Sequence, residues 1–212
     1  MQMVAVPAPQ RRHLDDGDQR LVLRGVPWRT YLMLNDAVEQ PSVRMAYCEG
    51  ELEIMTLGRR HELYKKMIAR LLELYALEHD LPLHGYGSMT LREEMKARGL
   101  EPDECYSLGR PLVDFPDLAI EVIVTHGGLD KLRIYQGLGV REVWRYADAA
   151  FTVFRLRGGR YERASASKLV PGMDFEALAR FVVREDQPAA IREFRDSLRV
   201  RPAKKKAARR RR

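Results

Sequence analysis

Residues 117–124, DLAIEVIV, are the most apolar of the strand-like segments in this chain of 212 residues. Branched apolar side chains in such a run are typical of a strand in the interior of a sheet. The run nevertheless carries a glutamate, Glu121, near its centre. A carboxylate leaves water at a high cost unless its charge is compensated. We therefore expect Glu121 to pair with a buried cation, to lie at a sheet edge, or to belong to a functional site.

The segments on either side of this strand alternate between helix and strand patterns, which predicts an α/β fold. The clearest helix spans residues 60–78, where apolar side chains recur at helical spacing at Leu63, Met67, Ile68, Leu71, Leu74 and Tyr75. Further helices are predicted at residues 26–39, 129–138, 174–183 and 187–198. Strands are predicted at residues 42–47, 51–56, 83–94, 103–108, 117–124, 141–147, 151–157 and 160–166. We expect a mixed central β-sheet with helices on both sides.

The net charge of +7 is concentrated at the C-terminus. The last 13 residues, VRPAKKKAARRRR, hold eight of the 37 Lys and Arg residues and no acid, which leaves 29 basic against 30 acidic residues in the rest of the chain. A block of like charges repels itself and cannot pack, so residues 200–212 are predicted to form a disordered basic tail. Such a tail either serves solubility or contacts a polyanion such as DNA.

The N-terminal residues give no sign of a membrane or secretion signal. The longest apolar runs fall far short of the ~20 residues that span a bilayer, and the opening MQMVAVPAPQRRH has no signal-peptide core. We expect a cytoplasmic protein that makes no membrane contact. We also expect residues 1–25 to be a flexible N-terminal extension and residues 26–199 to form one domain.

Acidic residues near the apolar strand allow a metal site. The triplet EPD at residues 101–103 precedes the strand at 103–108, and if that strand neighbours the DLAIEVIV strand, carboxylates from the two can meet. Carboxylate oxygens are the ligands that Mg²⁺ and Mn²⁺ prefer, and such an ion would offset the desolvation of Glu121. Lys131, at the start of the next helix, can point back at this position and stabilise negative charge on a phosphate. The spacing alone leaves a buried ion pair or an edge position open as alternatives.

Three segments, taken in order and spacing, resemble a known family. They are YCEGELEIMTLGRRHELYKKMIARLLE, then EPDECY, then FPDLAIEVIVTHGGLDKLRIYQGLGVREVWRY. Together they are similar to the Uma-type restriction endonucleases, a bacterial branch of the PD-(D/E)XK nuclease superfamily. The resemblance covers residues 26–181 and implies a restriction-endonuclease-like core.

The resemblance also assigns roles to individual residues. It makes Asp103 the acid of the PD motif and Glu121 the acid of the (D/E)XK strand, both of them metal ligands. Glu51, in the GEL turn, corresponds to an acidic position that supports the metal from the N-terminal part of the fold. Lys131 resembles the basic residue that this branch carries on the helix after the strand. His61 matches a recurrent position near the site, although a histidine in the first turn of a helix can also cap or pack there.

The sequence departs from the superfamily pattern at one position. The superfamily carries a lysine two residues after the strand acid, where this chain has Ile123. Alternation along a strand puts Ile123 on the same face as Glu121, so an apolar side chain stands where a cation would be expected. Lys131 is then the remaining obvious cation, and a two-metal arrangement is less strongly indicated.

The resemblance implies a metal-dependent endonuclease that hydrolyses DNA phosphodiester bonds with Mg²⁺ or Mn²⁺ and with Asp103, Glu121, Glu51, Lys131 and His61 at its site. DNA is then the expected partner. A homodimer is an arrangement that nucleases cutting both strands commonly adopt. The rival interpretation is a nuclease-like fold that has lost catalysis and binds nucleic acid or protein, which Ile123 favours.

Overall fold

The computed structural model describes residues 17–38, 40 and 42–200. The predicted basic tail from residue 201 and the first part of the predicted N-terminal extension lie outside these residues. Within them the chain forms an α/β fold with two β-sheets, which confirms the predicted fold class. In the described ranges no helix has the length and apolar character needed to cross a membrane.

The central sheet has six strands in the order β11-β10-β9-β8-β7-β4. The strands are β4 (Leu83–Gly87), β7 (Glu104–Leu108), β8 (Leu118–Ile123), β9 (Glu142–Ala147), β10 (Ala150–Arg157) and β11 (Arg160–Ala164). The DLAIEVIV segment is β8, which runs parallel to β9 and antiparallel to β7. The central sheet is therefore mixed, as predicted.

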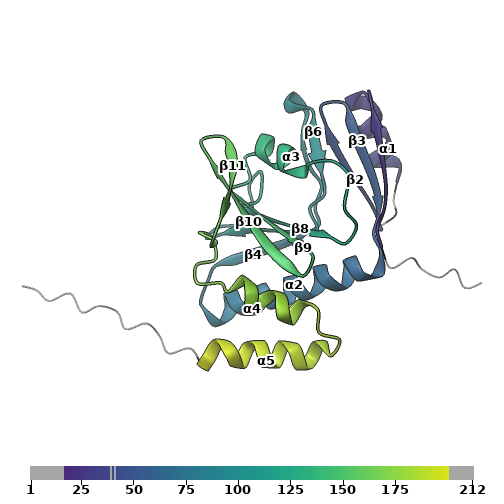
Figure 1. Cartoon of the computed structure of the whole chain (residues 1–212). Helices are drawn as coiled ribbons and strands as arrows, with labels where there is room; N and C mark the ends of the chain where they lie inside the picture. The colour runs from purple at the N-terminus through teal and green to yellow at the C-terminus, as the bar shows by residue number, and fades with distance from the viewer. Residues whose placement is uncertain (1–16, 39, 41, 201–212) are drawn as a thin grey trace, which may run out of the picture.

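Helices cover both faces of this sheet. On one face lie α2 (Arg59–Glu78) and α4 (Phe175–Val182), with α5 (Gln187–Val200) packed on these two helices, and on the other face lies α3 (Lys131–Leu138), as Figure 1 shows. Alternation along β8 sends Ile120 and Val122 toward α2, where they join the larger apolar core together with Trp144 and Tyr146. The intervening residues of β8, including Glu121, face α3.

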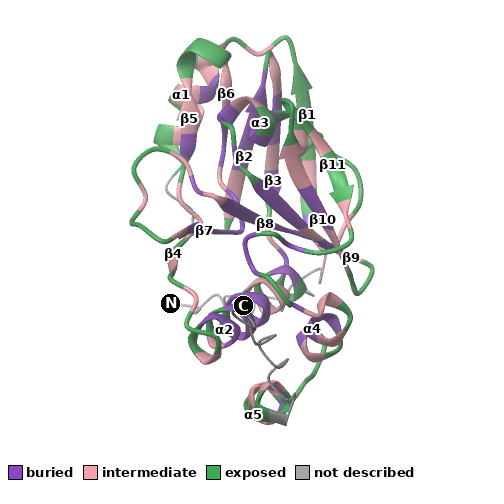
Figure 2. Ribbon diagram, turned by 90° about the vertical axis from the view of Figure 1, so that its left-hand side faces the viewer, coloured by how far each residue is buried: buried purple, intermediate pink, exposed green. Residues whose placement is uncertain are grey.

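A second sheet packs on the α3 side of the molecule (Figure 2). Its five strands follow the order β1-β3-β2-β6-β5, and helix α1 (Trp28–Ala37) packs on it. Its strands are β1 (Gln19–Arg24), β2 (Val43–Cys48), β3 (Glu51–Thr56), β5 (Leu91–Glu93) and β6 (Arg98–Leu100), with a short 3-10 helix, η1 (Glu94–Lys96), between the last two. The predicted hairpin at residues 42–56 is β2 and β3.

A strand forms before residue 26, the predicted start of the domain. Residues Gln19–Arg24 form β1, which pairs antiparallel with β3 along its whole length. The prediction of a flexible extension is therefore wrong for these residues. Their sequence, QRLVLR, shows no clean alternation and leaves most of its side chains exposed, so the strand is held by backbone pairing with β3 more than by burial.

Helix α2 supplies the test of the predicted core. Leu71 is fully buried among the side chains that join α2 to the central sheet, so Leu71→Ala is expected to lower the free energy of unfolding by about 2–5 kcal/mol. Leu77 lies on the same helix and is 75% exposed, so Leu77→Ala is the matched control, with an expected change within about 0.5 kcal/mol. Urea denaturation of both variants measures the difference. Equal midpoints for the two would contradict the assignment of the buried face.

Candidate functional site

The charge of Glu121 is met by side chains of α3. The Nζ atom of Lys131 lies 2.6 Å from Oε2 of Glu121, and the hydroxyl of Tyr135 donates to Oε1. Lys131 and Tyr135 are four residues apart and share one face of the helix. Asp130 caps this helix by accepting a hydrogen bond from the backbone N–H of Leu132. The sequence DKLRIY thus begins a helix whose first turns present a cation and a hydroxyl to the buried acid of β8.

Asp103 comes opposite Glu121 across neighbouring strands. Glu104 pairs with Ile120 in the antiparallel ladder of β7 and β8, so the residue before β7 continues this register to Glu121. Oδ2 of Asp103 accepts a hydrogen bond of 2.7 Å from the backbone N–H of Val122, and the residue is 1% exposed. The two strands are neighbours as the sequence analysis required, and they bring both acids to one place.

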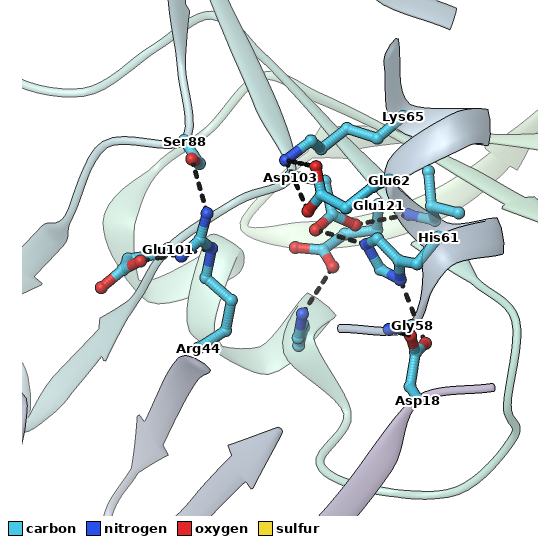
Figure 3. A network of polar contacts seen from close by, with 12 residues as sticks. Asp18, Arg44, Gly58, His61, Glu62, Lys65, Ser88, Glu101, Asp103 and Glu121 are labelled. Carbon is cyan, nitrogen blue, oxygen red and sulfur yellow. Dashed lines mark hydrogen bonds and ion pairs between the residues drawn. The ribbon is translucent and has the colours of Figure 1, made fainter. Parts of the chain in front are cut away.

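His61 joins Asp103 to a third acid. The ring lies in the first turn of α2, with Nδ1 3.0 Å from Oδ2 of Asp18 and Nε2 2.8 Å from Oδ1 of Asp103 (Figure 3). The other oxygen of Asp18 accepts from the backbone N–H of Gly58, the residue that precedes the helix. All three side chains are almost fully buried. Asp18 therefore caps the start of α2 and at the same time holds the histidine ring.

The burial of these groups and their mutual charges shift their pKa values. Burial lowers the pKa of His61, but the carboxylates of Asp103 and Asp18 outweigh it and raise the value to about 9, so the ring is a cation at neutral pH. Burial raises the pKa of Asp103, but the charges of His61 and Lys131 lower it by more, so the net shift of this pKa is downward. The pKa of Glu121 is raised by burial and, against the opposing effect of Lys131, by the charge of Asp103. The pKa of Lys131 is raised because nearby carboxylates outweigh its burial.

Glu53 holds the loop between β8 and α3. This acid of β3 is 1% exposed, and its Oε2 accepts a 2.7 Å hydrogen bond from the backbone N–H of Leu129. Arg20 lies 3.8 Å from the other oxygen and donates to the carbonyl of Gly127. A Cβ atom on Gly128 would lie 1.9 Å from Oε2 of Glu53, and this residue has a φ of +91°. The loop that leads to Lys131 therefore needs a glycine here to approach Glu53.

The structure brings four of the five predicted site residues together. Asp103, Glu121, Lys131 and His61 form one network of close contacts. Glu51 has other partners: its side chain is 31% exposed and pairs with Arg24 at 3.3 Å and Arg133 at 3.6 Å. Glu53 is the buried acid of that strand, and its charge acts on Lys131.

Three residues of this site were not among those predicted, namely Asp18, Glu53 and Tyr135. Alternation along ELEIM puts Glu53 on the same face as Glu51 and was a usable signal. The four-residue spacing from Lys131 was a signal for Tyr135. Asp18 has no such signal, because its partner His61 is 43 residues away.

The donor set of this site fits a hard divalent cation. Oδ1 of Asp103 is buried and makes no well-aligned hydrogen bond, although Nε2 of His61 lies 2.8 Å from it. Glu121 offers a second carboxylate across the strand pair, and its oxygens accept from Lys131 and Tyr135. Among the residues that the structure describes, no group of three or more His, Cys, Asp and Glu side chains is placed to hold an ion alone. Proteins commonly bind Mg²⁺ through one or two carboxylates, while water and substrate phosphate complete the shell.

Comparisons with known proteins place the fold and the family of this chain. A crystal structure of a "putative nuclease belonging to DUF820" from Anabaena variabilis is similar in fold, with a TM-score of 0.50 and 11% sequence identity over 73% of this chain and 99% of that one. No curated protein matches the sequence. The sequence model of the Uma2 family, described as "Putative restriction endonuclease", matches residues 28–181. Because this match spans most of the chain, the protein belongs to the Uma2 family.

Proposed function

We propose that this chain is an endonuclease that hydrolyses phosphodiester bonds of DNA with the help of Mg²⁺ or Mn²⁺. The observation that supports it best is the pair of buried acids, Asp103 and Glu121, on adjacent strands beside the ammonium group of Lys131. Membership of the Uma2 family supports the same chemistry. Contact of the basic tail with DNA and a homodimer remain predictions.

Each side chain has a role in this proposal. Asp103 and Glu121 would hold the ion, which when bound would supply an activated water and stabilise charge on the phosphate. Lys131 would stabilise the negative charge that develops on the phosphate oxygens. Tyr135 would fix the orientation of Glu121. His61, itself held by Asp18, would keep the carboxylate of Asp103 turned into the site, in the way that outer hydrogen bonds orient metal ligands.

The alternative function is a binding module without catalysis. Ile123 favours it, because the strand position two residues after Glu121 carries no cation. Two observations oppose it: Lys131 reaches Glu121 from α3, and Asp18 with His61 fixes Asp103, which is a costly arrangement to bury without use.

The Lys131→Ala variant separates the enzyme from the binding module. Removing a cation that stabilises the transition state is expected to slow nicking of supercoiled plasmid by about 10²–10³-fold. Affinity for Mg²⁺ should hold or rise, because Lys131 competes with the ion for Glu121. Lys168→Ala, an exposed lysine outside this network, is the control and should nick at the normal rate. A Lys131→Ala variant that nicks normally would remove this residue from the mechanism.

A further inference from the structure

A cavity of about 470 Å³ opens directly beside the two partners Glu121 and Lys131. It lies on the α3 face of the central sheet and is bounded by the end of β8, the loop at residues 126–130, the start of α3 and side chains of β9, β10 and β11. Its size is within the range of about 300–1,000 Å³ that is usual for small-molecule sites. It is large enough for one nucleotide.

The lining of this cavity carries more positive than negative charge. Four cationic side chains, Arg20, Lys131, Arg145 and Arg163, face two carboxylates. Those carboxylates already have partners. Glu121 is held by Lys131, and Asp130 caps α3 and lies 3.5 Å from Arg145. An anion entering this cavity would therefore gain more attraction than repulsion.

Two of these arginines are available to a ligand. Arg20 is not, because it contacts Asp18, Glu53 and the carbonyl of Gly127. Arg163 is exposed and makes no ion pair with any residue that the structure describes, and among those residues the ion pair of Arg145 is a long one of 3.5 Å with Asp130. Guanidinium groups bind phosphate through two parallel hydrogen bonds, so a pair of them is well suited to a phosphate group.

The two arginines lie over the ring of a largely buried apolar side chain. Their guanidinium carbons lie 5.1 Å and 6.0 Å from the ring centre of Phe154, which pairs directly with Arg163 across β10 and β11. Ile123 and Leu132 also line the cavity. A site that combines cations with apolar walls suits a ligand that has a phosphate and a sugar or base, more than it suits a bare inorganic anion.

We propose that this cavity takes one nucleotide of the DNA strand next to the bond that is cut, with its phosphate on Arg145 and Arg163 and its sugar or base against Ile123 and Leu132. The proposal rests on the proposed nuclease function and adds where the substrate strand lies. It also gives Ile123 a positive role, as part of the wall against which the nucleotide packs. Arg145 and Arg163 are then binding residues and take no part in the chemical step.

Binding of thymidine 5′-phosphate tests the cavity without any catalysis. Titrations by calorimetry or NMR in the presence of EDTA should show that the wild type binds thymidine 5′-phosphate at least about tenfold more tightly than thymidine or inorganic phosphate. The double variant Arg145→Ala/Arg163→Ala should lose about tenfold or more of this affinity. Arg160→Ala, on the same strand as Arg163 but at a position of opposite facing, should bind normally. Equal binding by the double variant and the wild type would overturn the proposal.

Nicking kinetics then connect the cavity to the reaction. The double variant is expected to raise KM for DNA by about tenfold or more with little change in kcat, because it removes binding that is equal in the ground and transition states. The salt dependence of DNA binding should flatten by about one to two in log–log slope, since two phosphate contacts are lost. If the wild type binds the nucleotide through these arginines but cuts no DNA, the proposed nuclease function is wrong and the cavity remains a nucleotide-binding site. If the double variant cuts with an unchanged KM, the cavity proposal fails and the nuclease function stands.

Discussion

Replacing Glu121 with glutamine is expected to reduce plasmid nicking by more than about 10³-fold, because the members of a catalytic unit act together and the loss of one disables the rest. Glutamine keeps the volume of the side chain. Its one amide oxygen can accept from Lys131 and its NH2 group can donate to the hydroxyl of Tyr135, so the fold should survive. What it removes is the negative charge that a divalent cation needs. We expect Mg²⁺ or Mn²⁺ to raise the melting temperature of the wild type by binding the folded state, and the variant should lose this rise.

Glu51→Gln is the matched control for this experiment. It makes the same change of charge at Glu51, the acid to which the family resemblance also assigns a role at the metal. Because Glu51 is partly exposed and pairs with Arg24 and Arg133, we expect its variant to keep both the melting shift and the nicking activity. A wild type that shows neither a metal-dependent shift in melting temperature nor nicking of plasmid would contradict the proposed endonuclease function. A Glu51→Gln variant that loses both the melting shift and the nicking activity would show that Glu51 belongs to the metal site.

The second large effect is expected on stability. His61→Ala should lower the free energy of unfolding by about 3–5 kcal/mol, because it leaves Asp18 and Asp103 buried without the cation that lies between them. Urea denaturation in the absence of divalent metal measures this loss. His126→Ala is the control, since that ring is 66% exposed and its contact with Asp148 lies at the surface.

A double variant tests whether charge is the cause. Adding Asp18→Asn to His61→Ala removes one of the two uncompensated charges, so the double variant should be more stable than the sum of the two single losses implies. Strict additivity would show that the histidine stabilises the protein through packing alone.

Local patterns in the sequence sufficed for most of the fold. The spacing of apolar residues in α2 and the run of branched residues in β8 are properties of adjacent residues, and both elements form where they were predicted. The prediction that Asp103 and Glu121 meet needed only that their strands be neighbours, which holds.

The rest depended on contacts between distant segments. Nothing local in QRLVLR predicts that it pairs with β3, and the role of Asp18 exists only because that pairing places the residue beside His61. The choice between Glu51 and Glu53 is similar. Both lie on one face of β3, but only Glu53 is covered by the loop at residues 126–130, which belongs to another part of the chain.

The spread of the site along the chain has a consequence for its synthesis. Asp18 is made first, and Lys131 and Tyr135 follow more than a hundred residues later. At about 5–20 residues per second, the ribosome takes several seconds to cover that distance. For most of this time the emerging chain holds Asp18 and His61 but not yet the strands β7 and β8 or helix α3, which carry the rest of the site. Unfinished or truncated chains that end before α3 are therefore expected to lack Lys131 and Tyr135, the partners of Glu121.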